Sequence, residues 1–138
     1  MQASIRLKDD DSIEGVTQSG HQVLMDRSPE VGGQNLGARP MEMLLLSLGG
    51  CTVIDVVLIL RKSRQVFSDI RIDIDAKRSD EIPKIFTHIH LHFVVTASEI
   101  DEKRVARAIS LSAEKYCSAS KMLDSVAEIT HDFEIVSG

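Results

Sequence analysis

The sequence has no excess of basic residues: 16 lysines and arginines stand against 21 aspartates and glutamates, which gives a net charge of -5 at pH 7. Nucleic acids and anionic membrane surfaces bind clusters of lysine and arginine, so we expect neither as a partner. Residues 1–5 also lack the apolar stretch and the small-residue cleavage site of a secretion signal. The expected compartment is therefore the cytoplasm.

Cysteine is scarce, and Cys51 and Cys117 are the only two in the chain. In a chain without an export signal, two cysteines indicate free thiols in a reducing compartment rather than a structural disulfide. Internal repeats, low-complexity segments and linkers are absent as well. The 138 residues are therefore expected to form a single domain with one hydrophobic core.

Only one long apolar run is present. It begins at Pro40, a residue suited to the first position of a helix, and it has Glu42 in the first turn, where the helix dipole favours an acid. From there to Leu60 nearly every residue is apolar, which predicts a helix that is buried on all sides. The run is just long enough to span a membrane, but it contains Asp55 and has no second span beside it. We expect a soluble central helix.

The other segments alternate apolar and polar residues or show helical spacing. Strands are predicted at 3–7, 13–17, 21–25, 67–77, 85–96 and 128–136, and a second helix at 101–116. The early strands are linked too briefly for crossover helices, so the fold class is α+β with mainly antiparallel sheet. One small sheet covers one side of an apolar helix, which predicts a homodimer.

Cys51 is the first candidate for chemistry. It follows Gly49 and Gly50, which allow another backbone or a substrate to approach but cost about 1 kcal/mol each within a helix. The alternative is a thiol packed as a small hydrophobe. Asp55 shares the helix face of Cys51 and would raise the pKa of the thiol, unless a cation offsets its charge or it is engaged elsewhere.

Glu42 and Cys117 are linked to Cys51 less directly. Glu42 lies on the opposite helix face, about 13 Å away along the axis, so it reaches the thiol only from a partner subunit or across a helix break. Its alternative role is that of an ordinary first-turn acid. Sequence spacing does not show whether Cys117 lies near Cys51, although two thiols are the minimum for a peroxidatic and resolving pair.

Three histidines, His88, His90 and His92, alternate along the predicted strand 85–96 and share one face. Two of them could chelate a metal ion, but no third type of ligand is evident nearby, and an exposed strand face explains all three. We expect no metal and no cofactor.

Two segments resemble those of a known family. Pro40-Met41-Glu42, followed by an apolar helix that reaches Gly49-Gly50-Cys51, looks like the central helix of the OsmC / organic hydroperoxide resistance (Ohr) family. The stretch from Ser112 to Ser118 is similar to the segment of the second cysteine. Residues 41–57, 86–93 and 111–118 especially resemble the YhfA-like branch.

The resemblance implies an intertwined α+β homodimer with active sites at the subunit interface, and the reduction of organic hydroperoxides in defence against oxidative stress. In that chemistry the Cys51 thiolate attacks the peroxide and becomes a sulfenic acid. Cys117 then forms a disulfide with it, which an external dithiol reduces. Glu42 helps to order the site.

The sequence departs from the family pattern in two respects. None of Arg6, Arg27 and Arg39 aligns with the arginine by which family peroxidases stabilise the thiolate, and Ser118 stands where they more often have proline. Two other functions stay open. One is a dimer that binds a small apolar ligand at its interface, and the other is an enzyme such as a thioester hydrolase.

Overall fold

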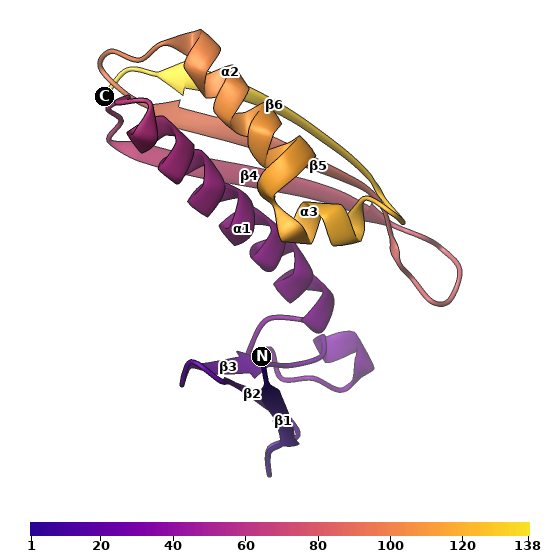
Figure 1. Cartoon of the computed structure of the whole chain (residues 1–138). Helices are drawn as coiled ribbons and strands as arrows, with labels where there is room; N and C mark the ends of the chain where they lie inside the picture. The colour runs from indigo at the N-terminus through magenta and orange to yellow at the C-terminus, as the bar shows by residue number, and fades with distance from the viewer. The chain divides into compact units, whose positions relative to one another are not determined.

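A computed structural model describes all residues from 1 to 138. The chain divides into two compact units, Met1–Leu46 and Ser47–Gly138, which we call the N-terminal unit and the C-terminal unit. Figure 1 gives the order of the elements along the chain. The single domain expected from the length of the chain stays a prediction.

The N-terminal unit contains a three-stranded antiparallel sheet of β1 (Ala3–Leu7), β2 (Ile13–Thr17) and β3 (Gln22–Met25). Gly20 lies in the turn between β2 and β3 with a φ of 89°, a conformation that favours glycine. The strands predicted at 13–17 and 21–25 thus form an antiparallel hairpin. Every residue of β1 is exposed within this unit.

Hydrogen bonds to the Asp26 side chain stabilise the loop after β3. The Asp26 carboxylate accepts the backbone N–H groups of Arg27 at 2.8 Å, Gln34 at 2.9 Å and Leu36 at 3.1 Å. The N–H groups of Gln34 and Leu36 lower the pKa of the Asp26 carboxyl, because they bond to its ionised form. A short 3-10 helix, η1 (Pro29–Val31), lies within this loop.

The C-terminal unit has a sheet in the order β4 (Asp69–Arg78), β5 (Phe86–Thr96) and β6 (Glu128–Val136). β4 pairs antiparallel with β5, whereas β5 pairs parallel with β6. The parallel pair requires a crossover, which α2 (Glu102–Leu111) provides. The predicted α+β class is confirmed, with one parallel pair among mainly antiparallel ones. Figure 1 shows α2 and α1 on the same face of this sheet.

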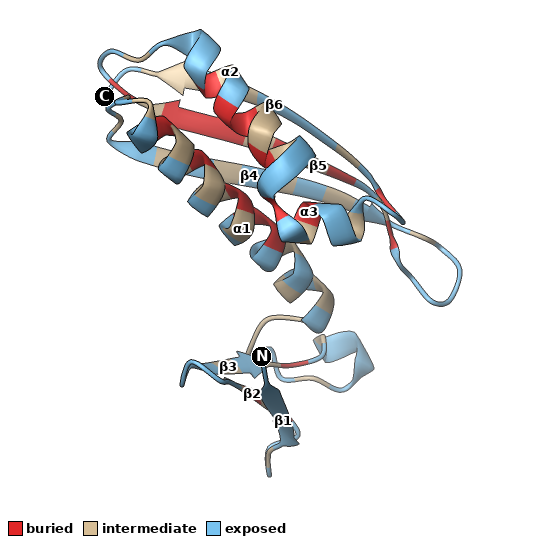
Figure 2. Cartoon of the chain, viewed as in Figure 1, coloured by how far each residue is buried: buried red, intermediate tan, exposed pale blue.

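The central helix α1 runs from Pro40 to Lys62, two residues beyond its predicted end. Its Leu48, Val56 and Leu60 are completely buried. Ile54 and Leu58, however, are 61% and 60% exposed. In the single chain the helix's own sheet thus covers one side only, as expected, and burial of the other side by a second copy stays a prediction. Figure 2 shows this contrast along α1.

By length and composition alone, α1 is also the one helix that could cross a membrane. Its buried residues pack within the C-terminal unit, and Asp55 accepts a hydrogen bond from a neighbouring serine. These are the contacts of a core helix in a folded domain.

The strand β5 forms the middle of the core. Ile89, Leu91 and Phe93 are buried on the face toward the helices, while the histidines between them face the other way. The alternation predicted for this strand is thus confirmed. Val105, Ala108 and Ile109 of α2 complete the buried layer.

The predicted helix 101–116 has two parts. Asp101 caps α2 by accepting the Lys103 N–H at 2.9 Å, and α2 ends at Leu111. A π-helical turn, η2 (Ser112–Tyr116), follows, and then the short helix α3 (Ser118–Leu123). A π-turn adds a residue to the helical turn and frequently occurs at functional sites.

Candidate functional site

α1 carries two side chains that could act in chemistry within the C-terminal unit. Cys51 and Asp55 are four residues apart, so they lie one turn apart on the same face of the helix. Cys51 is half-buried and free. The preceding Gly49 allows α1 to approach the sheet, because a methyl group there would lie 2.9 Å from the Cδ1 atom of Ile74.

The π-helical turn η2 brings Cys117 to the same place. The Cys117 backbone N–H donates to the Ser112 carbonyl at 2.9 Å, which ends η2, and Cys117 then caps α3. Its sulfur accepts the Ser120 N–H at 3.3 Å and lies 3.6 Å from the Thr52 hydroxyl. Cys117 is buried, and it too is a free thiol.

The three candidate groups converge. The Cys51 sulfur, the Cys117 sulfur and a carboxylate oxygen of Asp55 all lie within 4.8 Å of one another. The Ser112 hydroxyl donates to the Asp55 carboxylate at 3.0 Å. Asp55 is thus engaged by Ser112, one of the alternatives that the sequence left open. Sequence reasoning did not select Ser112, and its only signal was its position in the segment of the second cysteine.

The surroundings of the two thiols shift their pKa values in opposite directions. The Ala119 N–H lowers the pKa of Cys51, but burial and the adjacent Cys117 outweigh it and raise the pKa above its ordinary value. Burial raises the pKa of Cys117, but hydrogen bonds from Ser120, Thr52 and Cys51 bring it below its ordinary value. When one of the two thiols ionises, the negative charge is therefore favoured on the buried sulfur, that of Cys117.

Glu42 acts within its own helix end in the N-terminal unit. Its Oε1 atom accepts the Arg39 N–H at 2.7 Å, which satisfies a free donor at the start of α1. This contact fits the role of a first-turn acid, and a role at the thiols stays a prediction.

The three arginines compared with the family arginine all have partners in the N-terminal unit. Arg39 donates to the Asn35 side chain at 2.9 Å and to the Gly37 carbonyl at 3.0 Å. Salt bridges join Arg6 to Glu14 at 3.5 Å and Arg27 to Asp11 at 3.7 Å.

The profile of the OsmC-like protein family matches residues 32–132. This chain belongs to the OsmC-like family. Protein YhfA of Escherichia coli strain K12 is 44% identical over 137 residues, with 99% of each chain covered. The resemblance inferred from the two cysteine segments is thus confirmed.

Solved structures agree with this assignment. A hypothetical protein from Aquifex aeolicus VF5 is 31% identical, with a TM-score of 0.86 over 99% of this chain and 96% of that chain. An organic hydroperoxide resistance protein OsmC from Legionella pneumophila is 12% identical, with a TM-score of 0.72 over 96% of this chain and 95% of that one. At that identity the second comparison shows the fold alone.

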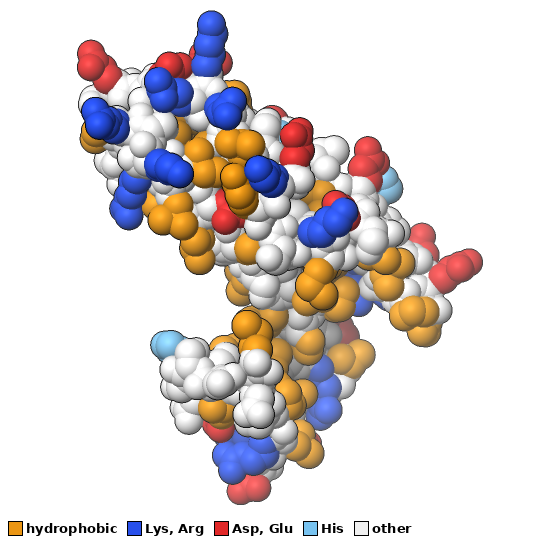
Figure 3. All heavy atoms as spheres, viewed as in Figure 1, with side chains coloured by type: hydrophobic (Ala, Val, Ile, Leu, Met, Phe, Trp, Pro, Cys, Tyr) orange, Lys and Arg blue, Asp and Glu red, His pale blue; other side chains and the backbone are white.

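A hollow of about 500 Å³ opens beside Asp55 in this OsmC-like chain. Its other lining residues are Leu58, Ile59, Lys62, Ser63, Arg107, Leu111 and Tyr116. Its lining therefore combines apolar side chains with two cations. Figure 3 shows apolar side chains exposed among lysines and arginines on this side of the C-terminal unit.

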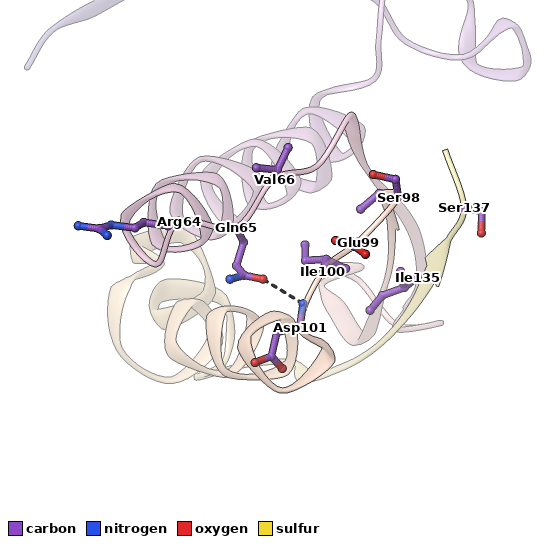
Figure 4. A pocket seen from close by; sticks show the side chains of 10 residues that line it. Arg64, Gln65, Val66, Ser98, Glu99, Ile100, Asp101, Ile135 and Ser137 are labelled. Atoms are coloured by element: carbon purple, nitrogen blue, oxygen red, sulfur yellow. Dashed lines mark hydrogen bonds between the residues drawn. The ribbon is translucent and has the colours of Figure 1, made fainter.

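A second hollow, of about 740 Å³, lies where α1 ends and α2 begins (Figure 4). The Gln65 side chain points across it and accepts the Asp101 N–H at 2.9 Å. No thiol or imidazole lines it, so we assign no chemistry to it.

Cys51, Asp55 and Cys117 also form a set of donors that suits a thiophilic metal ion, because thiolates and a carboxylate are ligands of zinc. The same closeness is what disulfide formation requires. The thiols of this OsmC-like site can therefore serve redox chemistry or hold an ion, but not both at once.

Proposed function

We propose that this OsmC-like protein is a thiol-dependent peroxidase that reduces organic hydroperoxides. The observation that carries the proposal is the convergence of two free thiols and a carboxylate from distant parts of the sequence. The Legionella pneumophila protein of the same fold is named as an organic hydroperoxide resistance protein, which supports this substrate class.

The first step takes place at Cys51, because its sulfur is the more accessible of the two. Cys51 gives its proton to the Cys117 thiolate or to Asp55, and its own thiolate attacks the outer oxygen of the hydroperoxide. The O–O bond breaks, a sulfenic acid forms on Cys51, and the alkoxide takes up a proton and leaves as an alcohol.

In the second step, Cys117 resolves the sulfenic acid. The Cys117 sulfur attacks the Cys51 sulfur, the S–O bond breaks, and hydroxide leaves with a proton as water. The product is a Cys51–Cys117 disulfide. An external dithiol then supplies two electrons and two protons, which restores both thiols.

Asp55 would carry the proton in this cycle. Its carboxylate lies within 4.8 Å of both sulfurs and is oriented by the Ser112 hydroxyl at 3.0 Å. It can accept the thiol proton and return it to the leaving alkoxide, which is general acid–base catalysis. Ser112 is then a positioning residue.

The protein would work as a cytoplasmic homodimer. Ile54 and Leu58 leave an apolar face of α1 uncovered in the single chain, which a second copy would bury. In such a dimer, Glu42 would approach the thiols from the partner subunit and help to order the site.

The test is to mix the reduced protein with cumene hydroperoxide or hydrogen peroxide and count free thiols over time. Wild type is expected to lose both thiols rapidly with the organic peroxide. Cys51→Ser should abolish turnover, while Cys117→Ser should trap a sulfenic or overoxidised Cys51. Undiminished turnover in Cys51→Ser would end the proposal.

Asp55→Asn is expected to slow peroxide consumption by roughly 10²-fold or more, as loss of an acid–base group does. Asp75→Asn, an exposed carboxylate change on β4, is the matched control and should leave the rate unchanged. Ser112→Ala should have a smaller effect that shifts the pH profile. Equal rates for Asp55→Asn and Asp75→Asn would remove Asp55 from the mechanism.

The order of thiol ionisation gives a further prediction. Thiolate absorbance in wild type should appear below the pH at which an ordinary cysteine ionises, because the pKa of Cys117 is lowered. In Cys117→Ser the neighbouring sulfur that raises the pKa of Cys51 is gone, so Cys51 should ionise at lower pH than in wild type and react faster with iodoacetamide. Slower alkylation of Cys51 in that variant would contradict the assigned charge distribution.

A second candidate is a non-catalytic dimer that binds a small apolar ligand. The hollow beside Asp55, with Leu58, Leu111 and Tyr116 in its lining, favours it. A ligand carried through purification, and still bound after both thiols are alkylated, would identify this function instead.

A further inference from the structure

The outer face of the C-terminal sheet carries a cluster of histidines and acids that the redox chemistry does not use. His88, His90 and His92 of β5 face away from the helices. β6 runs parallel to β5, in a register that pairs His88 with Glu128 and His92 with Asp132. Acidic side chains of β6 therefore lie beside His88 and His92, although the sequence indicated no third ligand type nearby.

Asp132 joins two of the histidines. Its Oδ1 atom lies 3.0 Å from Nε2 of His90 and 2.6 Å from Nδ1 of His92. One carboxylate oxygen thus lies between two imidazole nitrogens, and two adjacent strands of a sheet support the three side chains. The two histidines are 42% and 33% exposed at their side chains, so an ion can reach them from solvent.

The remaining ring nitrogens have partners of their own. Nδ1 of His90 lies 2.7 Å from the Thr130 hydroxyl, and Nε2 of His92 lies 3.2 Å from Oε1 of Glu134. In metal sites, a ligating histidine almost always bonds through its other nitrogen to a carboxylate, a carbonyl or water, which fixes the ring. This second set of contacts would hold both rings oriented while their other nitrogens bind an ion.

The charge of this face also favours a cation. Its basic side chains are Arg71 and Lys77 on β4, and Arg71 is already paired with Asp73 at 3.1 Å. Its carboxylates are Asp73, Asp75, Glu128, Asp132 and Glu134. Acids thus exceed bases, and a divalent ion would offset the difference.

We propose that His90, His92 and Asp132 form a binding site for a divalent transition-metal ion of the zinc type. Nitrogen and carboxylate donors suit zinc, copper or nickel, whereas magnesium and calcium prefer oxygen ligands alone. Three protein ligands leave a fourth position for water, the arrangement of an open zinc site. The ion would join β5 to β6 on the face of the sheet opposite α1 and α2.

The test measures binding of Zn²⁺ to the reduced full-length chain by isothermal titration calorimetry. Because the thiols could also bind zinc, the Cys51→Ser/Cys117→Ser variant is titrated in parallel and is expected to retain one ion per chain. Co²⁺ added to the same variant should give a d–d spectrum without the thiolate charge-transfer band.

The ligands are then removed one at a time. His90→Ala, His92→Ala and Asp132→Asn should each weaken Zn²⁺ binding on the order of tenfold or more. His21→Ala, an exposed histidine in the N-terminal unit, is the matched control and should bind as wild type does. None of these four positions is buried, so circular dichroism should report an unchanged fold.

Three results would overturn the proposal: no Zn²⁺ binding at all, binding that survives the His90→Ala/His92→Ala double change, or binding that vanishes only with the thiols. The last result would place the ion at Cys51, Asp55 and Cys117. None of these results depends on peroxidase activity, so the metal site and the proposed function are tested independently of each other.

Discussion

The two units differ in what they bury. The residues buried within the N-terminal unit are Ser12, Gly15 and Asp26, none of which is a large apolar residue. The C-terminal unit buries a continuous layer that includes Leu48, Ile89 and Phe93. Hydrophobic burial therefore stabilises the second unit, while backbone pairing and the bonds to Asp26 maintain the first. A small sheet without an apolar core needs cover from elsewhere, and a second copy of the chain would supply it.

The two units should differ most in how much unfolding free energy is lost when an apolar side chain is truncated to alanine. Phe93→Ala is expected to destabilise the chain by about 3–5 kcal/mol, because it removes a fully buried ring. Ile5→Ala, at a position 65% exposed in the single chain, should cost less than about 0.5 kcal/mol in a monomer. Urea unfolding measures both values.

Repeating the Ile5→Ala measurement at several protein concentrations tests whether a partner covers β1. If a partner covers β1, the cost of Ile5→Ala should rise with protein concentration, because association stabilises the folded state by mass action. A small cost that is independent of concentration would mean that β1 stays uncovered.

An intermediate effect is expected at Asp26. Its pKa is lower in the folded than in the unfolded chain, so its contribution is present above the unfolded pKa and is lost as pH falls through the folded pKa. The protection factors of the Gln34 and Leu36 amides, which compare observed with intrinsic exchange at each pH, should therefore fall at acidic pH. Asp26→Asn should show low protection at every pH, and a wild-type protection factor that does not change with pH would contradict this account.

A small effect of the opposite sign is expected at the glycine pair before Cys51. Apart from its chain neighbours and its own helix backbone, no atom of the chain lies within 4 Å of a methyl group added to Gly50. Gly50→Ala should thus stabilise a monomer by about 1 kcal/mol through helix propensity. Gly49→Ala should gain less, because its methyl group displaces Ile74. If Gly50→Ala instead weakens a dimer in sedimentation experiments, the partner approaches α1 at this glycine.

Local patterns predicted most of the fold. Alternation located β5 with its two faces, and Pro40 located the start of α1. The parallel pairing of β6 could not be read from periodicity, because alternating residues give no strand direction. The exposure of Ile54 also escaped prediction, since an apolar side chain indicates burial without saying which chain supplies the cover.

The sequence predicted the identity of the two cysteines in the site but not how close together they lie. Cys51 and Cys117 stood out by their rarity and by the family resemblance, but their closeness depends on the path of η2, which helical spacing does not reveal. The hydroxyl of Ser112 was overlooked, because a serine inside a predicted helix carries no distinctive signal. Asp132 became a candidate ligand only through the register of β5 and β6.

Cys117 carries a reactive sulfur and is also the N-cap residue of α3. Its sulfur accepts the Ser120 N–H as a thiol or thiolate, and the neutral sulfur of a disulfide is a poorer acceptor than a thiolate. A cycle that oxidises Cys117 would thus loosen the first turn of α3 and restore it on reduction. The strength of the hydrogen bond from the Ser120 backbone N–H would then report the redox state of the protein without any added label.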